Sequence, residues 1–314
     1  MSVFKDNVAS TGNTPLVQIQ KLCPGAVANV YAKIEARNPG FSAKDRIAVA
    51  MVDDAEKRGL LHAGDIIVEP TSGNTGLGLA FVAAARGYKL ILVMPDSMSI
   101  ERRKLAAAYG AKLELTPGVQ GMQGSINRAK QILAENPGHS FMPQQFENPA
   151  NPAAHRATTG PEIWDALSGK VDAIVATVGT GGTFSGIAQY LKKDRKHKVW
   201  AVAVEPAESP LITQARAGKP LKPGLHKIQG IGANFIPKNL DMELIDEVIA
   251  VKSDAAIEAA RELPKQEGIL AGISSGAALV AAAELAKRPE FKGKNIVAVF
   301  PDSGERYLSS LYEL

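Results

Sequence analysis

The sequence predicts an α/β fold of two domains, each with a twisted, mainly parallel sheet flanked by helices. Apolar, β-branched runs of strand length alternate along the chain with helical patterns, which is typical of parallel sheets wound on both faces. The length of 314 residues suggests about two domains, although one continuous α/β unit of this size is not unusual. Glycine-bearing loops follow several runs, and such folds bind ligands at the carboxyl ends of their strands.

Eight segments have the composition of strands. They are rich in Val, Ile and Leu, and most are separated by helical stretches. In chain order they are residues 30–35, 66–69, 90–94, 112–115, 173–178, 199–204, 247–251 and 296–300.

Composition and cysteine content exclude several classes of protein. Hydrophobic residues make up 45% of the chain and aromatic residues 5%, which fits an alanine-rich α/β protein. The longest apolar run, residues 76–85, is too short to span a bilayer, and the first residues contain no long apolar stretch. We therefore expect a cytoplasmic location and no membrane partner. Cys23 is the single cysteine, which rules out an intrachain disulfide, and the five histidines show no metal-binding spacing.

Residues 192–198 form the one basic cluster, and the net charge of +4 invites a nucleic-acid interpretation. No aromatic residues alternate with these cations, as base stacking would require. Cations that follow a helix C-terminus also complement its dipole. We interpret the segment as solvated surface and expect no nucleic-acid partner.

A candidate phosphate-binding loop follows the run that begins at Ala173. The run breaks into Gly179, Gly181 and Gly182 and then enters a helical pattern. Glycines let the backbone approach an anion, and the first N–H groups of a helix bind negative charge with the help of its dipole. The segment therefore predicts a phosphorylated ligand.

Three kinds of phosphate ligand share this design. A Walker loop needs lysine where this chain has Ile187, so that interpretation fails. A dinucleotide fingerprint needs a third Gly or Ala after Gly179 and Gly181, where the chain has Phe184. Glu205 nevertheless ends the next strand-like run, where a ribose-binding acid would lie, so dinucleotide binding remains the second choice. The third ligand is a small cofactor such as pyridoxal phosphate, which requires a reactive lysine.

Lys44 is the candidate for that lysine. Asn38, Pro39 and Gly40 predict a turn, Ser42 an N-cap, and the apolar residues that follow predict a helix with Lys44 in its first turn. A cation is disfavoured there by about 0.3–1 kcal/mol. The neutral amine is therefore favoured, which suits a nucleophile that attacks an aldehyde. Without the phosphate loop, a solvated lysine beside an aspartate would be the better interpretation.

A second glycine-bearing turn links the strand-like run 66–69 to a helical pattern. Its residues are Thr71, Ser72, Gly73, Asn74, Thr75 and Gly76. Hydroxyl and N–H donors at a helix start bind an anion, here a carboxylate, or simply cap the helix.

Two other functions remain open at this point. Residues 272–276 match the nucleophile elbow of α/β-hydrolases, with Ser274 as nucleophile, but the expected order needs a later histidine and the last one is His226. A phosphate-ligand sensor would require Lys44 to be idle. A visible absorption band would separate both from a pyridoxal-phosphate enzyme.

Taken together, these motifs resemble those of the A-type cysteine synthases (O-acetylserine sulfhydrylases), tryptophan synthase beta-like enzymes of pyridoxal-phosphate fold type II. The resemblance covers nearly the whole chain. Its motifs are residues 12–16, 42–46, 69–76, 94–95, 101–103, 144–146, 159–164, 179–183, 230–232, 272–276 and 303–307. Asn234 departs from it, because the family usually carries glycine at this position.

The resemblance implies roles for individual residues. Lys44 would hold the cofactor and carry the proton. The other implied cofactor ligands are Gly179, Thr180, Gly181, Gly182 and Thr183 for the phosphate, Asn74 for the ring hydroxyl and Ser274 for the pyridine nitrogen. The implied substrate ligands are Thr71, Ser72, Gly73, Asn74, Thr75 and Gln145 for the carboxylate, with Gly230 bordering the site. No metal is implied.

The implied reaction is a pyridoxal-phosphate-dependent β-replacement, which makes L-cysteine and acetate from O-acetyl-L-serine and sulfide through an α-aminoacrylate intermediate. A neutral hydroxyl at Ser274 cannot stabilise a protonated pyridine, which favours β-elimination over transamination. The sequence leaves open O-phosphoserine sulfhydrylase and cystathionine β-synthase activities.

The resemblance also implies a domain division and partners. Residues 1–39 and 148–314 would form the larger, phosphate-binding domain, and residues 40–147 the smaller domain with the carboxylate loop. The family implies a homodimer and binding of the C-terminal tail of serine acetyltransferase.

Overall fold

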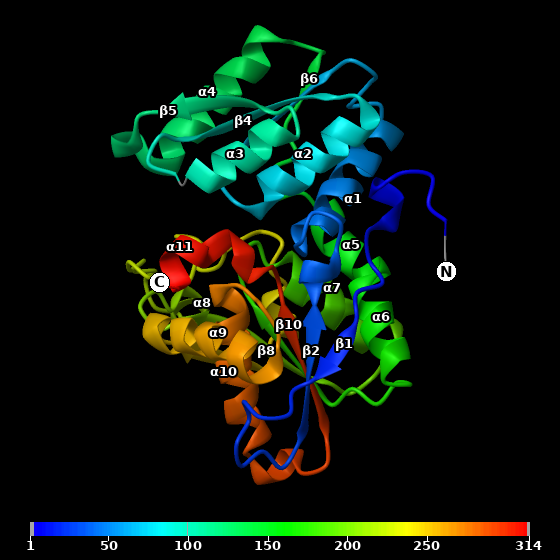
Figure 1. Cartoon of the computed structure of the whole chain (residues 1–314), viewed down its shortest axis with the longest axis vertical. Helices are drawn as coiled ribbons and strands as arrows, with labels where there is room; N and C mark the ends of the chain where they lie inside the picture. The colour runs from blue at the N-terminus through cyan, green and yellow to red at the C-terminus, as the bar shows by residue number, and fades with distance from the viewer. Residues whose placement is uncertain (1–2, 99, 313–314) are drawn as a thin grey trace. The chain divides into compact units, whose positions relative to one another are not determined.

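The computed structural model describes residues 3–98 and 100–312. They separate into two compact units (Figure 1). The smaller unit contains the segment that ends at Thr11 together with Asn38–Asn151, and the larger contains Gly12–Arg37 and the chain from Pro152 onward. The segment that ends at Thr11 is thus grouped with the smaller unit, whereas the resemblance implies the larger one.

The smaller unit is built on a four-stranded parallel sheet in the order β5-β4-β3-β6. The strands are β3 (Ile66–Pro70), β4 (Lys89–Pro95), β5 (Lys112–Thr116) and β6 (Ser140–Phe141). The helices are α1 (Lys44–Lys57), α2 (Asn74–Arg86), α3 (Ile100–Ala108) and α4 (Gly121–Glu135), with the short helices η1 (Val8–Ser10) and η3 (Gly118–Gln120).

Helices cover both faces of this sheet. Ile67 and Leu92 point into a core shared with α1, α2 and α3, which lie along one face (Figure 1). Val68 and Val93 point the other way and pack against α4. Because successive strand residues face opposite sides and both sides are covered, the central strands β3 and β4 are mostly apolar.

The larger unit is built on a six-stranded sheet in the order β1-β2-β10-β7-β8-β9. Only β1 is antiparallel to its neighbour. The strands are β1 (Leu16–Gln18), β2 (Asn29–Ile34), β7 (Ala173–Thr177), β8 (Trp200–Pro206), β9 (Glu247–Val251) and β10 (Asn295–Phe300). The α-helices are α5 (Ala150–Ala157), α6 (Thr159–Ala166), α7 (Gly182–Gln189), α8 (Leu211–Arg216), α9 (Ser253–Glu267), α10 (Ile273–Ala286) and α11 (Leu308–Leu311).

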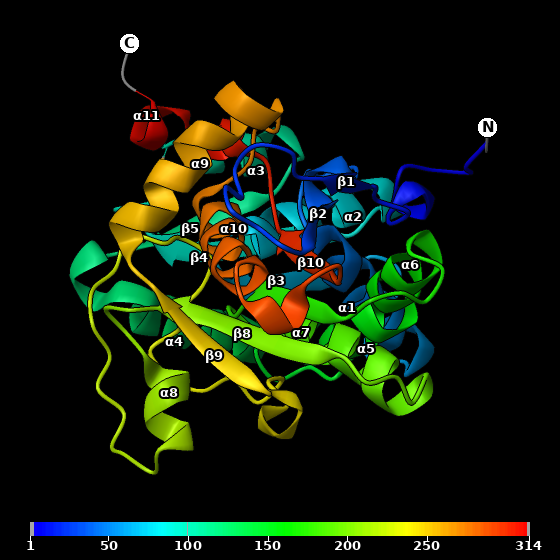
Figure 2. The same ribbon diagram turned by 90° about the horizontal axis from the view of Figure 1, so that it is seen from below.

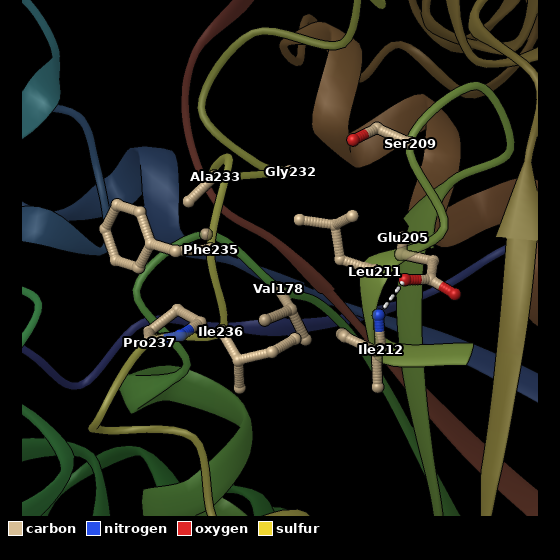
Figure 3. Close-up of a pocket in the computed structure, with 11 residues that line it drawn as sticks. Val178, Glu205, Ser209, Leu211, Ile212, Gly232, Ala233, Phe235, Ile236 and Pro237 are labelled. Atoms are coloured by element: carbon tan, nitrogen blue, oxygen red, sulfur yellow. Dashed lines mark hydrogen bonds between the residues drawn. The ribbon is translucent and has the colours of Figure 1, made fainter. Parts of the chain in front are cut away.

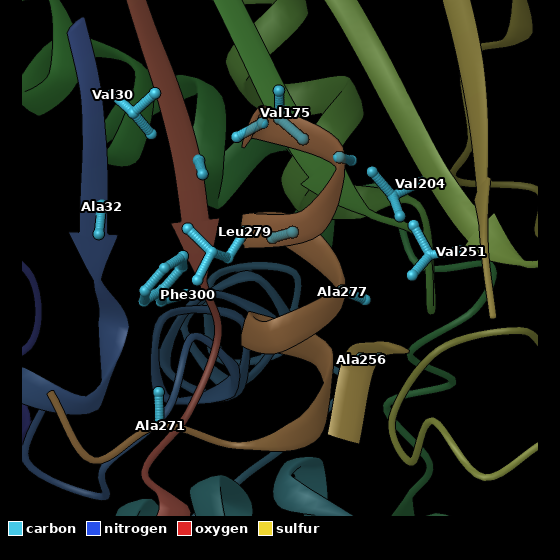
Figure 4. Close-up of a cluster of buried hydrophobic side chains, with 14 of the residues drawn as sticks. Val30, Ala32, Val175, Val204, Val251, Ala256, Ala271, Ala277, Leu279 and Phe300 are labelled. Atoms are coloured by element: carbon cyan, nitrogen blue, oxygen red, sulfur yellow. The ribbon is translucent and has the colours of Figure 1, made fainter. Parts of the chain in front are cut away.

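The short helices of the larger unit are η2 (Glu35–Arg37), η4 (Tyr190–Asp194), η5 (Met242–Leu244), η6 (Pro289–Phe291) and η7 (Gly304–Tyr307). On one face of the sheet, α9 and α10 lie side by side (Figure 2). Small side chains let the two helices pack closely on the strands and on each other. In Figure 4, Leu279 lies next to Phe300 of β10, and Ala277 lies on the side of α10 that faces Ala256. On the other face, Phe184 and Ile187 of α7 pack against β7, β8 and β10.

All eight predicted strands are confirmed, with bounds that differ by no more than two residues at either end. Strands β1 and β6, which have three and two residues, were not predicted. Both lie at the edge of a sheet and are partly exposed, so neither has the continuous apolar run that marks a buried strand.

Three cations of the basic cluster, Lys192, Lys193 and Arg195, contact other side chains of the larger unit. Lys192 Nζ lies 2.5 Å from an oxygen of Asp246, and Lys193 Nζ lies 3.1 Å from one of Asp241. The Arg195 guanidinium stacks over the rings of Trp164 and Tyr190. These contacts support the interpretation of the segment as surface rather than as a phosphate-binding stripe.

Cys23 is a partly buried thiol next to a carboxylate. Burial, together with the nearby Glu267, raises the pKa of Cys23 to about 11. The thiol is protonated at neutral pH and is therefore a weak nucleophile. Among the described residues, no helix combines the length and the apolar character that crossing a bilayer requires.

Candidate active site

Lys44 is the first residue of α1, as the sequence predicts. The preceding turn is confirmed by a hydrogen bond of 2.9 Å from Phe41 N to Asn38 O. The predicted cap is wrong in detail, because Ala43 occupies the N-cap position. Ser42 Oγ still accepts the Lys44 N–H at 3.2 Å. The turn therefore holds Lys44 at a helix start, where the dipole disfavours a cation.

The candidate carboxylate loop joins β3 to α2. Helix α2 begins at Asn74, and its N-cap, Gly73, offers no side chain. Simple capping by a hydroxyl therefore does not explain the loop. Thr71 Oγ1 instead accepts the Gly73 N–H at 3.2 Å, which folds the loop back on the end of β3. The first N–H groups of α2 are thereby presented at the carboxyl end of a parallel strand.

The structure brings Gln145 to this loop. Thr75 Oγ1 donates to Gln145 Oε1 at 2.5 Å, and Gln145 Nε2 lies 3.5 Å from Thr71 Oγ1. Gln145 follows β6, which pairs with β3, so the two segments meet at the same sheet edge. Seventy residues separate Gln145 from Thr75 in the chain, and their contact satisfies polar groups that are buried together.

Glu69 of β3 contacts the backbone at Gln144 and Gln145 and was not identified from the sequence as a site residue. It is 2% exposed and accepts the Gln144 and Gln145 N–H groups at 3.1 and 3.3 Å. Burial raises the pKa of Glu69 to about 7, against the lowering effect of these two hydrogen bonds. A charged residue inside an otherwise apolar strand was the sequence signal that could have revealed it.

In the larger unit, the candidate phosphate loop runs from the end of β7 into α7. A Cβ atom at Gly179 would lie 2.3 Å from Gly230 O, and one at Gly181 would lie 2.7 Å from Leu240. Gly181 also has a φ of 83° and is the N-cap of α7. Glycine is therefore required at both positions. At Gly179 a neighbouring carbonyl leaves no room for a side chain, and at Gly181 both a neighbouring residue and the left-handed backbone conformation exclude one.

His155 supports the same loop from α5 and was not identified from the sequence. Its Nε2 lies 3.1 Å from Thr183 Oγ1, and its Nδ1 lies 2.8 Å from Thr159 Oγ1. His155 is 1% exposed. His155 and Thr159 are four residues apart in the consecutive helices α5 and α6, but only the tertiary structure joins them to Thr183.

Ser274 lies in the first turn of α10, buried at 4% exposure. The hydrolase interpretation fails here, because the segment before Gly272 forms only an isolated bridge, from Ala271 to Ser303, instead of the strand that a nucleophile elbow needs. Two further hydroxyls, Thr177 Oγ1 and Ser275 Oγ, are buried without a hydrogen-bond partner among the described residues.

A small pocket lies beside the phosphate loop (Figure 3). The carboxylate of Glu205, at one side, accepts the Ile212 and Thr213 N–H groups at 2.7 and 3.0 Å. It thus anchors the start of α8 and is not available to a ribose, which removes the structural basis for dinucleotide binding.

The segment 232–237 forms another wall of this pocket. A hydrogen bond of 3.0 Å from Gly232 N to Val178 O ties the segment to the strand end that precedes Gly179. Asn234 does not adopt the left-handed backbone conformation found at Gly232. A side chain at position 234 is therefore accommodated without backbone strain.

Comparison with known proteins decides among the remaining interpretations. Residues 9–302 match the family described as pyridoxal-phosphate dependent enzyme. The chain belongs to this family. It is 56% identical over 309 residues to cysteine synthase A of Escherichia coli K12, covering 98% of this chain and 95% of that protein.

Solved structures of this enzyme family agree. Cysteine synthase from Entamoeba histolytica is similar with a TM-score of 0.94 and 42% identity, covering 100% of this chain and 92% of that one. A hydrogen sulfide-producing enzyme from Fusobacterium nucleatum has a TM-score of 0.92 and 44% identity, covering 98% and 99%. The expected fold type, enzyme class and cofactor are thereby confirmed.

The residues of the chain fit pyridoxal phosphate. Gly179 and Gly181 leave no room for side chains, so the backbone N–H groups at the start of α7 are open to a phosphate. The buried, unpartnered hydroxyl of Thr177 comes directly before this loop, and that of Ser275 lies next to Ser274. Buried hydroxyls without a partner fit a site for a polar ligand, which would supply the missing hydrogen bonds.

Proposed function

We propose that this enzyme makes L-cysteine and acetate from O-acetyl-L-serine and sulfide. The observation that carries the proposal is the 56% identity with cysteine synthase A across 98% of the chain. The donor-lined loop at the end of β3, with Gln145 bonded to Thr71 and Thr75, supports it, since an amino-acid substrate needs a carboxylate site.

We assign the remaining roles as the family resemblance implies. Lys44 binds the cofactor, and the phosphate ligands are Gly179, Thr180, Gly181, Gly182 and Thr183. Asn74 contacts the ring hydroxyl and Ser274 the pyridine nitrogen. The substrate carboxylate is bound by Thr71, Ser72, Gly73, Asn74, Thr75 and Gln145, and Gly230 borders the site.

Bound pyridoxal phosphate supplies the electron sink that makes the substrate Cα proton acidic. Lys44 Nζ takes that proton as a neutral amine and later returns it to Cα. Between these transfers the Cβ–O bond breaks, acetate leaves with its electron pair, and sulfide forms the Cβ–S bond. The loop after β3 holds the carboxylate throughout and orients Cα toward Lys44. A neutral Ser274 hydroxyl would hold the pyridine nitrogen without a proton, which would favour loss of the β-substituent.

A stoichiometric assay of the purified holoenzyme tests this function. We expect one acetate and one L-cysteine for each O-acetylserine consumed. Without sulfide we expect no L-cysteine and only slow release of acetate. The same assay is run with O-phosphoserine and sulfide, and with serine and homocysteine. A higher kcat/KM for either alternative pair would assign the chain to O-phosphoserine sulfhydrylase or cystathionine β-synthase activity.

Replacing Ser72 with alanine should raise the KM for O-acetylserine about 10-fold or more, because a hydrogen bond to a charged group contributes about 1.5–3 kcal/mol. The visible absorption of the cofactor should stay unchanged, since Ser72 is assigned to the substrate only. Ser97→Ala, in the exposed loop after the neighbouring strand β4, is the matched control. Loss of the cofactor from Ser72→Ala would instead assign the loop to pyridoxal phosphate.

A peptide that ends in isoleucine, as a stand-in for the tail of serine acetyltransferase, should compete with O-acetylserine. Helix-start donors and the Gln145 amide recognise a carboxylate whatever molecule carries it. Binding should perturb the cofactor spectrum and weaken at least 10-fold when the peptide is C-terminally amidated, because the amide is uncharged. Equal affinity for acid and amide peptides would reject this mode of binding.

A further inference from the structure

Glu69 is a buried acid that the proposed reaction does not use. It lies one residue before the end of β3 and is 2% exposed. Among the described residues it forms no ion pair, and its partners are backbone N–H groups. Oε2 accepts from Gln144 N at 3.1 Å, and Oε1 accepts from Gln145 N at 3.3 Å. Each carboxylate oxygen therefore holds one of two successive residues in the segment after β6.

The backbone that Glu69 holds is strained. Gln144 has a φ of 56°, in the left-handed region that few residues other than glycine adopt. Such a conformation persists only where surrounding bonds enforce it. Besides Glu69, Asn151 provides an anchor, since its Nδ2 donates to Gln145 O at 2.8 Å.

The strained turn aims the Gln145 side chain back at β3. Its amide meets the Thr75 and Thr71 hydroxyls at 2.5 and 3.5 Å. Glu69 and Thr71 are two residues apart at the end of β3, and both contact the segment 144–145. Glu69 binds its backbone N–H groups, and Thr71 binds the Gln145 side-chain amide.

We propose that Glu69 is a positioning residue for the substrate carboxylate, which sets the Gln145 amide against Thr71 and Thr75 so that their donors converge. This inference rests on the proposed function of the loop. Both oxygens must accept, and only a carboxylate offers two acceptors in this geometry. Burial raises the pKa of Glu69 to about 7, while the two N–H groups that it accepts favour the ionised form; protonation below this pH turns one of the two oxygens into a donor.

The test replaces Glu69 with glutamine in the full-length holoenzyme. Glutamine keeps the volume but turns an NH₂ group toward one of the two N–H donors. We expect the KM for O-acetylserine to rise about 10-fold, with kcat and the KM for sulfide changed less than about twofold. The absorption spectrum and the affinity for pyridoxal phosphate should match the wild type. If Glu69 only stabilised the fold, the substitution would lower stability without raising the KM for O-acetylserine selectively.

A second substitution tests how Glu69 acts. Gln144→Gly in the Glu69→Gln background removes the cost of the left-handed backbone, because glycine adopts positive φ freely. It should restore part of the affinity for O-acetylserine. If Glu69→Gln is too unstable to purify, Glu69→Asp is measured instead. Its carboxylate is one methylene shorter and cannot reach both N–H groups, so the KM should rise as well.

Glu267→Gln is the matched control, since Glu267 accepts the N–H groups of Gln20, Lys21 and Leu22 in the larger unit. Its KM values should equal those of the wild type. If Ser72→Ala raises the KM and neither Glu69 variant does, the inference is overturned and the proposed function stands. If neither the Glu69 variants nor Ser72→Ala change the KM, the carboxylate assignment of the loop is itself wrong.

Discussion

Lys44→Ala should lower cysteine formation by about 10³-fold or more, because general acid–base catalysis contributes about 10²–10⁴-fold and the covalent attachment of the cofactor is lost as well. The fold should persist, since alanine is the best helix former and Lys44 is the first residue of α1. The measurement is kcat with O-acetylserine and sulfide at saturating pyridoxal phosphate. Lys57→Ala, at the exposed end of the same helix, should retain full activity.

The attachment itself can be mapped. Borohydride reduction of the wild-type holoenzyme, followed by peptide mass spectrometry, should place the cofactor on the peptide that contains Lys44. An adduct on another lysine would refute the assignment even if Lys44→Ala were inactive. Activity of Lys44→Ala within tenfold of the wild type would remove Lys44 from the proton transfers.

Gly179→Ala should weaken pyridoxal phosphate binding about 10- to 100-fold. The added Cβ would lie 2.3 Å from Gly230 O, so the phosphate loop and the segment 230–232 must move apart. Overpacking of this kind costs about 1–3 kcal/mol, and each 1.4 kcal/mol is about tenfold in affinity. The measurement is the absorbance of the apoprotein titrated with pyridoxal phosphate.

Gly218→Ala provides the control for adding a methyl group to a glycine. It has a φ of 64°, and no atom lies within 4 Å of the added Cβ, so only backbone strain is introduced. We expect lower stability and unchanged cofactor affinity. If Gly179→Ala bound pyridoxal phosphate as tightly as Gly218→Ala, Gly179 would not belong to the phosphate site.

The strands and the two glycine-bearing loops could be predicted because their signals are local. Each buried strand carries a continuous apolar run, since helices cover both faces of its sheet. The phosphate loop is marked by glycines directly after such a run. The position of Lys44 at a helix start follows from a turn and an apolar pattern within ten residues. The resemblance then added roles to positions that these patterns had already singled out.

The contacts that shape the two loops could not be predicted in the same way. Glu69 and Gln145 are 76 residues apart, and their contact exists because the sheet order places β6 beside β3. The short edge strands β1 and β6 carry too few residues for a periodic signal. Likewise, His155 reaches Thr183 only through the packing of α5 against α7.

The sequence by itself therefore determined which segments form strands, which loops offer anion donors and which lysine starts a helix. These properties depend on neighbours within about one turn or one strand. Only the tertiary structure decided that Gly230 O lies next to Gly179. It also decided that Glu69 binds the backbone at Gln145, whose side-chain amide contacts Thr71 and Thr75. These contacts depend on strand order and on the close packing of residues far apart in the chain, which local sequence patterns do not encode.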